Sequence, residues 1–374
     1  MEVKKKVNSL GSPLYSRFNS HFKWTIHICQ FTNHNSQFTK KSLLVFSFYL
    51  LVSLSASAQK PELYEMRAKD GEVNAQYNLA LCYSNGWGTD RDYSQAVYWY
   101  TQAATQGHAK AQYNLGLLYS KGLGTKKDIA QAVHWYSQAA KQGITDAQYN
   151  LALCYKNGEG FPRDYTKAAY WFSVVAEKGD AEAQYNLGVF YEEGWGVEQD
   201  YAKAVQWYTK AADQGVLMAQ YNLGLCYQNG TGVAQDYEQA VRLYTPLAKR
   251  GFASAQYNLA VCYDNGWGVA QDYQQAVHYY TQAAGQGNAM AQYNLGRCYY
   301  NGQGVDIDYP KAIRWFSAAA LQGLKEAQYS LGVCYYNGDG VEQDNDKAAY
   351  WILKAADQGH KKAQELLEKW EKEK

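Results

Sequence analysis

The sequence predicts an all-α protein, a right-handed superhelical α-solenoid of antiparallel helix pairs. The main observation is an internal repeat of 36 residues, marked by the tetrapeptide Ala-Gln-Tyr-Asn. The tetrapeptide begins at Ala75, Ala111, Ala147, Ala183, Ala219, Ala255 and Ala291, becomes Ala-Gln-Tyr-Ser at Ala327, and fades at Ala363. Eight full units therefore run from residue 75 to residue 362. A unit of this size cannot bury its own apolar face, so consecutive units are expected to stack.

The first half of each unit predicts an amphipathic helix. In the first copy, Ala75, Leu79 and Tyr83 are spaced by four residues and therefore share one helical face. Asn85 and Gly86 follow this face, and glycine readily takes the left-handed conformation that ends helices. We expect the first helix to end at this point.

The second half of each unit predicts another helix, opened by an aspartate. A carboxylate here can accept from the free N–H groups of the first turn. In four units a glutamine stands three residues later, as Gln95 does, which predicts a capping box. Gly107 is expected to end this helix in the first unit. The aspartate occurs in all eight units, at Asp92, Asp128, Asp164, Asp200, Asp236, Asp272, Asp308 and Asp344.

Together these features resemble a known family. The pattern A-x-x-x-L-[GA]-x-x-Y, N-G-x-G, D-Y-x-x-A and W-Y-x-x-A-A-x-x-G, at a period of 36, is similar to the Sel1-like repeat, a relative of the tetratricopeptide repeat. The tetratricopeptide period of 34 does not fit. The resemblance implies a non-catalytic scaffold that binds a protein or peptide in the concave groove, lined by the first helices. Some relatives are described as β-lactamase-like, so a secreted cell-envelope glycan-binding protein or hydrolase is the alternative.

The segments outside the eight units have separate predictions. Residues 1–39 are non-periodic and are expected to be disordered. Residues 40–58 combine two lysines, a short apolar run at 42–54 and Ala56-Ser57-Ala58, which predicts a signal peptide cleaved near Ala58 and export to the periplasm or the medium. An uncleaved membrane anchor is the alternative. Residues 59–74 are expected to form a partial capping repeat, and 363–374 a C-terminal capping helix.

The sequence offers no evidence of chemistry. The formal net charge is +1, so a nucleic-acid partner is not expected. The common hydrolase, metalloprotease and phosphate-loop motifs do not occur. No cofactor, metal ligand or catalytic residue is therefore predicted. Six cysteines stand in register where two units carry Leu118 and Phe190, so we interpret them as packing residues: Cys82, Cys154, Cys226, Cys262, Cys298 and Cys334.

Candidate partner-binding residues come from two positions on the first helix. The recurring tyrosine of the tetrapeptide offers a large contact area, although packing between units is an alternative role. The position after the second tyrosine differs between units, as expected for residues free to contact a partner. The candidates are Tyr77, Tyr113, Tyr149, Tyr185, Tyr221, Tyr257 and Tyr293 at the first position, and Lys156, Glu192, Asp264, Tyr300 and Tyr336 at the second. In the loops, Trp87, Trp195 and Trp267 are expected either to anchor a partner or to cover their own loops.

Overall fold

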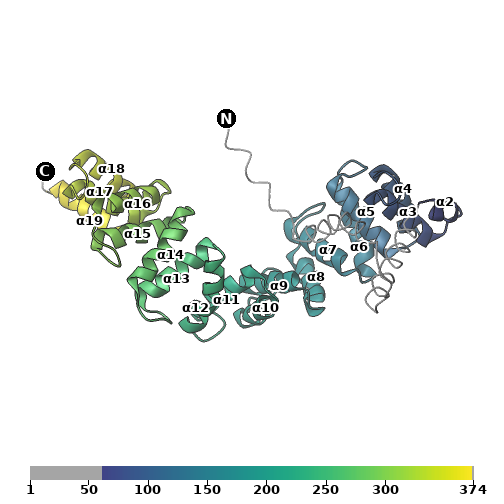
Figure 1. Cartoon of the computed structure of the whole chain (residues 1–374), viewed down its shortest axis with the longest axis horizontal. Coiled ribbons are helices and arrows are strands. Elements are labelled where there is room, and N and C mark those ends of the chain that lie inside the picture. The colour runs from purple at the N-terminus through teal and green to yellow at the C-terminus, as the bar shows by residue number, and fades with distance from the viewer. Residues whose placement is uncertain (1–60, 373–374) are drawn as a thin grey trace, which may run out of the picture. The chain divides into compact units, whose positions relative to one another are not determined.

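A computed structural model describes residues 61–372, which form eighteen α-helices and no strands (Figure 1). The all-α prediction is confirmed. The predicted extension and signal peptide lie outside the described residues. The first helices of units 1 to 8 are α3 (Val73–Asn85), α5 (Ala109–Lys121), α7 (Thr145–Asn157), α9 (Ala181–Glu193), α11 (Leu217–Asn229), α13 (Ala253–Asn265), α15 (Ala289–Asn301) and α17 (Lys325–Asn337).

The second helices of the same units alternate with the first. They are α4 (Tyr93–Thr105), α6 (Ile129–Lys141), α8 (Tyr165–Glu177), α10 (Tyr201–Asp213), α12 (Tyr237–Lys249), α14 (Tyr273–Gly285), α16 (Tyr309–Leu321) and α18 (Asn345–Asp357). Helices α2 (Glu62–Lys69) and α19 (Lys361–Lys372) stand at the two ends. From α3 onward, each helix packs chiefly on the helices that precede and follow it in the chain. The array is therefore an α-solenoid of repeated helix pairs.

The hydrophobic core joins the two helices of each pair and continues into the next unit. In the cluster after unit 4, Ala204 and Tyr208 of α10 are buried together with Leu223 and Cys226 of α11, the next first helix. Equivalent clusters recur along the array. Each helix pair thus completes the burial of its apolar face by stacking on its neighbour, as solenoid units do.

The helix ends follow the predicted chemistry with one exception. Asp200 accepts a hydrogen bond from the backbone N–H of Lys203 at 2.9 Å, and the first helix of unit 1 ends at Gly86, with a left-handed φ of 73°. The predicted capping box is wrong. In a capping box the backbone N–H of Asp92 would donate to the glutamine side-chain oxygen, but here it donates to the carbonyl of Tyr83 at 3.0 Å. This bond ties the second helix to the first.

From unit 2 onward, the second glycine of the loop between the two helices is required by a contact with the preceding unit. Gly196 has a φ of 68°, and a Cβ atom added there would lie 2.3 Å from the carbonyl carbon of Tyr165. Non-bonded atoms cannot approach so closely, so only glycine lets this loop rest on the start of α8 in the preceding unit. Gly215 has a similar φ of 89°, but nothing lies within 4 Å of an added Cβ.

A row of buried glutamines joins neighbouring units through hydrogen bonds. In unit 4, the Nε2 atom of Gln184 donates to the carbonyl of Ala176 in unit 3 at 3.1 Å. Its Oε1 atom accepts from Gln214 at 2.8 Å, and Gln214 also donates to the carbonyl of Gly179 at 3.0 Å. Because buried polar groups are costly when unpaired, this network explains the glutamine of the tetrapeptide.

The six in-register cysteines are buried, as expected for packing residues. Burial raises the pKa of the Cys154 and Cys262 thiols to about 11, and that of Cys226, Cys298 and Cys334 to about 12. A thiol with so high a pKa is almost entirely protonated at neutral pH and is a weak nucleophile.

Candidate functional site

The recurring tyrosines of the first helices have a packing contact and a partly exposed surface. Tyr77 packs on Tyr100 of its own unit, with ring centroids 6.0 Å apart, and the six equivalent pairs lie at 5.7 to 6.2 Å. The first-helix members of these six pairs are Tyr113, Tyr149, Tyr185, Tyr221, Tyr257 and Tyr293. All seven tyrosines are half-buried, and burial raises the pKa of Tyr113 and Tyr149 to about 12. Each ring therefore belongs to the framework on one side and to the surface on the other.

Two predicted site residues are engaged by buried phenols. Glu192 accepts a hydrogen bond from the hydroxyl of Tyr208, and Asp264 accepts one from Tyr280 at 3.2 Å. Burial is the main cause of the raised pKa of Tyr208, and the bond to Glu192 raises it further. The two carboxylates thus satisfy the second-helix tyrosine that stands sixteen residues after them.

The other three predicted residues at this position reach toward the next unit. The Lys156 ammonium donates to the Asn186 Oδ1 atom at 2.9 Å. Tyr300 donates to the Asp339 carboxylate at 2.7 Å. The ring of Tyr336 lies 5.2 Å from that of Trp370 in α19, and 39% of the residue is exposed.

A simple rule separates the two groups. Where the second helix carries a tyrosine, the first-helix residue is an acceptor: Ser84, Ser120, Glu192, Gln228 or Asp264. Where the second helix carries Phe172, Phe316 or Ile352, the first-helix residue is Lys156, Tyr300 or Tyr336. The sequence contains this signal as a pairing at a spacing of sixteen residues, but a comparison of single positions cannot find it.

The loop tryptophans contact the preceding unit. Trp195 stacks on Tyr165 with a centroid distance of 5.1 Å, and Trp267 stacks on Tyr237 at 5.0 Å. They therefore cover the neighbouring helix start rather than their own loop. Trp87, in unit 1, is 39% exposed.

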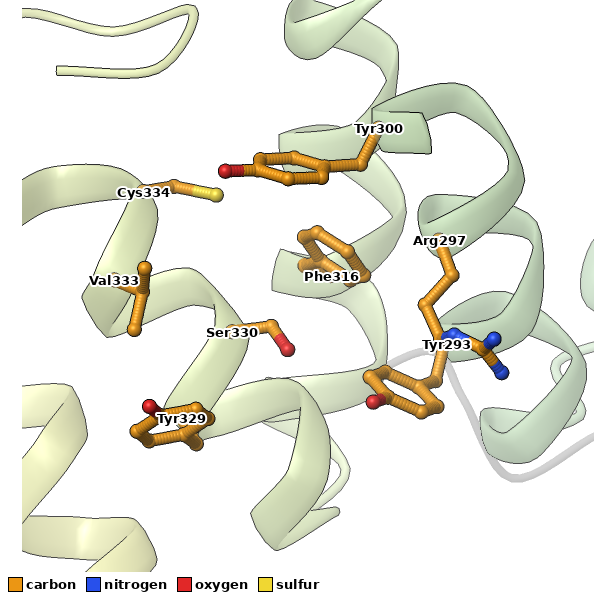
Figure 2. A pocket seen from close by; sticks show the side chains of 8 residues that line it. All are labelled: Tyr293, Arg297, Tyr300, Phe316, Tyr329, Ser330, Val333 and Cys334. Carbon is orange, nitrogen blue, oxygen red and sulfur yellow. The ribbon is translucent and has the colours of Figure 1, made fainter. Parts of the chain in front are cut away.

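One pocket brings two predicted site residues together with residues that the sequence analysis missed. It has a volume of about 200 Å³ and lies where α15 and α16 meet α17 (Figure 2). Tyr293 and Tyr300 are the predicted members. Its full lining is Tyr293, Arg297, Tyr300, Phe316, Tyr329, Ser330, Val333 and Cys334.

Several lining residues depart from the repeat. Arg297 of unit 7 stands where the other seven units have leucine or valine, and Ser330 of unit 8 stands where units 1 to 7 have asparagine. Elsewhere this asparagine bonds the second-helix phenol, as Asn114 does with Tyr100 at 3.1 Å. In the pocket, Ser330 is shorter and Phe316 lacks the hydroxyl, so neither partner of that bond is present. These departures, taken together in register, are the signal that could have located the pocket.

Within residues 61–372, no group of three or more His, Cys, Asp or Glu side chains is placed to hold a metal ion. Among the helices of the same segment, none combines the length and apolar character needed to span a membrane.

Comparisons with known proteins agree with this geometry. A crystal structure of c5321, a protective antigen of uropathogenic Escherichia coli with an SLR fold, is 38% identical, with a TM-score of 0.71 over 82% of this chain and 66% of that one. The chain thus spans slightly less than two thirds of that antigen. A Sel1 repeat protein from Oxalobacter formigenes is 35% identical, with a TM-score of 0.64 over 83% of this chain and 89% of that one. No curated protein matches the chain.

The family model for the Sel1 repeat matches eight consecutive segments, each of 36 residues. The matches are 73–108, 109–144, 145–180, 181–216, 217–252, 253–288, 289–324 and 325–360. Sel1-repeat proteins are generally protein-interaction scaffolds and are typically non-catalytic, and the comparisons give no support to a glycan-binding protein or hydrolase. The repeat period, the helix pairs and the family model agree, and the chain belongs to the Sel1-repeat family.

Proposed function

We propose that this protein is a non-catalytic scaffold that binds an extended segment of a partner protein along the surface of its first helices. We call this the first-helix surface, formed by the recurring tyrosines and the differing residues beside them. The observation that carries the proposal is the row of half-buried tyrosines, which repeats on consecutive first helices and is held in place by the second-helix aromatics. Rigid aromatic side chains make large contacts at low cost in conformational entropy.

The residues next to this row support the same role. Met218 and Met290 stand at the second residue of α11 and α15, and each is 41% exposed. Exposed methionines adapt to varied apolar side chains of a partner. The units differ at this position, which also holds Lys110, Asp146 and Glu182. Each unit therefore presents a different small patch beside the same tyrosine.

The test compares two surfaces of the full chain. Peptides are selected from a random library on the wild-type protein, and their affinities are then measured for two double variants. Met218→Ser with Met290→Ser alters the first-helix surface, whereas Tyr98→Ser with Tyr170→Ser alters exposed second-helix aromatics, which are 53% and 60% exposed. We expect about a tenfold loss for the first variant, since a few apolar anchors carry most binding energy, and little change for the second.

The opposite pattern of losses, or a library that yields no binder, would overturn the proposal. Leu295→Ala serves as a control for folding, because Leu295 is fully buried. It should lower the free energy of unfolding by about 2–5 kcal/mol through the cavity it leaves.

We also propose export of the protein after cleavage near Ala58. The support is the sequence of residues 40–58, with its lysines, short apolar run and Ala-Ser-Ala site. Sequencing the N-terminus of the protein purified from its source tests the proposal. A mature chain that starts at Gln59 is expected, and a chain that retains residues 42–54 in the membrane would support an anchor instead.

A further inference from the structure

We propose that the pocket formed by α15, α16 and α17 binds the side chain of an aspartate or glutamate within the partner segment, through the guanidinium of Arg297. This inference rests on the proposed function, because it assumes a peptide on the first-helix surface. It adds the chemistry of the residue that is recognised and the place where recognition occurs.

The first argument concerns charge. Arg297 makes no hydrogen bond or ion pair with any residue in the described part of the chain. Two acidic side chains of neighbouring units are already engaged, since Asp264 accepts from Tyr280 and Asp339 accepts from both Tyr300 and Asn337. Arg297 is partly buried and lines a pocket walled by aromatic rings (Figure 2). A guanidinium in such a setting favours a carboxylate, which it can bind through two parallel hydrogen bonds.

The second argument concerns what the arginine replaces. At the same position in units 1 to 6, the leucine or valine packs against a hydrophobic cluster, as Leu117 and Leu225 do. Packing alone would favour another aliphatic residue at this place. The neighbouring departures, Ser330 and Phe316, remove the asparagine–phenol bond that joins other units. An added charge and the loss of that bond therefore coincide in one pocket.

The third argument concerns the walls. The Tyr300 ring packs on Tyr309 at 5.1 Å and on Phe316 at 6.3 Å, while its hydroxyl is held by Asp339. Tyr293 packs on Phe316 from the other side, at 5.9 Å. These rings are thus fixed before a ligand arrives, and fixed apolar walls strengthen a charge-assisted hydrogen bond by excluding water.

The surface around the pocket favours an Asp or Glu side chain within a continuous partner segment over the carboxylate at the end of a partner chain. Exposed Met290 lies at the start of α15, and exposed Tyr336 lies near the end of α17. The tyrosine row runs through the pocket, with Tyr293 and Tyr329 in its lining, and continues with Tyr257 in α13 of the preceding unit. A segment that places its acid on Arg297 would therefore find further contacts in both directions, and a pocket of about 200 Å³ suits a single side chain.

The experiment uses the full chain and a synthetic library of peptides with acetylated and amidated ends, so that Asp and Glu side chains are their only carboxylates. Binders are selected on the wild type, and each acidic residue of a binder is replaced by its amide. We expect one acid whose replacement weakens binding at least tenfold, as loss of a charge-assisted pair does. When the protein carries Arg297→Leu, replacing the same acidic residue of the peptide by its amide should change the peptide's affinity less than twofold.

Two controls keep the result interpretable. Arg297→Leu installs the residue that units 1, 2, 3 and 5 carry, so its melting temperature should not fall. Lys110→Leu removes another exposed cation of the first-helix surface and should leave the effect of the acid unchanged.

The outcomes separate the two proposals. Binders that are sensitive to Met218→Ser with Met290→Ser but indifferent to their acids would overturn this inference and leave the proposed function standing. An acid effect that persists in Arg297→Leu would also overturn it. Failure to select any binder, or binders insensitive to every first-helix variant, would overturn both.

Discussion

At the scale of single residues, a buried hydroxyl decides what a surface position can do. The phenol of Tyr208 is fully buried and needs an acceptor, which Glu192 supplies. In unit 3, Phe172 needs none, and Lys156 in the equivalent place reaches Asn186 instead. Two positions that look independent in the sequence are therefore coupled.

This coupling gives the first prediction. Glu192→Lys should lower the free energy of unfolding by about 1–3 kcal/mol, because it leaves the Tyr208 hydroxyl without its acceptor. Adding Tyr208→Phe should restore most of that loss, since the pair then matches Lys156 and Phe172 of unit 3. Urea denaturation of both single variants and the double variant measures the interaction. Strictly additive effects would show that the two residues are not coupled.

A second prediction uses two glycines with similar backbones and different neighbours. Gly215→Ala should cost about 1–2 kcal/mol, the usual penalty for a left-handed residue with a Cβ atom. Gly196→Ala should cost clearly more, by a further 1–3 kcal/mol or so, because its Cβ would collide with the backbone of Tyr165. Thermal melting of both variants compares them directly. Equal losses would mean that the loop does not need this close approach.

At the scale of helices, the glutamine network joins each unit to the next. Gln184 donates to Ala176 and accepts from Gln214, so both of its polar atoms are used. In unit 5, Gln220 donates to Ala212, but Arg250 replaces the partner glutamine and no described side chain donates to the Gln220 Oε1 atom.

The difference leads to a third prediction. Both Gln184→Leu and Gln220→Leu remove a side-chain donor from a backbone carbonyl, but only Gln184→Leu also leaves the Gln214 amide without one of its acceptors. Gln184→Leu should therefore lower stability by about 1–3 kcal/mol more than Gln220→Leu. Chemical denaturation of the two variants provides the measurement. A larger loss for Gln220→Leu would show that packing, rather than the network, sets the cost.

The helices were largely predictable from the sequence, whereas the contacts between units were not. The repeat, the Asp200-type caps and the glycine helix ends are local signals, so the helix pairs followed from them. The contact of Gly196 with Tyr165 links residues 31 positions apart, and the bond of Gln214 to Gly179 spans 35. Such contacts depend on how units stack, which periodicity alone does not determine.

The candidate site was predictable in part for the same reason. The tyrosine row and Tyr300 follow from position in the repeat, and both take part in the surface described above. Arg297 was missed because it is a departure at a single framework position. Its meaning depends on Ser330 and Phe316, which are brought to the same pocket only by the fold.

At the scale of the whole molecule, the buried thiols predict a loss of stability in alkali. Five thiols have pKa values raised to about 11 or 12, from an ordinary value of 9.0. At pH values between the ordinary thiol pKa and the raised one, the folded chain keeps protons that the unfolded chain has released, so stability falls as the pH rises. The half-buried Tyr113 and Tyr149, whose pKa values are raised to about 12, act in the same direction.

The fourth prediction follows from this proton balance. The melting temperature should be nearly constant up to about pH 8.5 and should fall progressively above pH 9. The melting temperature of Cys226→Leu should fall less steeply with pH, because this variant lacks one ionising group. Leucine is tolerated at this position in unit 2, as Leu118. Differential scanning calorimetry from pH 7 to pH 11 checks this. A flat profile to pH 11 would contradict the raised pKa values.

The pairing of acceptors with phenols also implies an order in which the units of such an array can diversify. A mutation at Glu192 that comes first leaves Tyr208 unsatisfied and is selected against through the loss of stability. Loss of the hydroxyl that comes first leaves a solvated carboxylate, which is then free to mutate. The change from tyrosine to phenylalanine is therefore the permissive step. In this chain, the three units with Phe172, Phe316 and Ile352 are the ones whose first-helix residue is a lysine or a tyrosine.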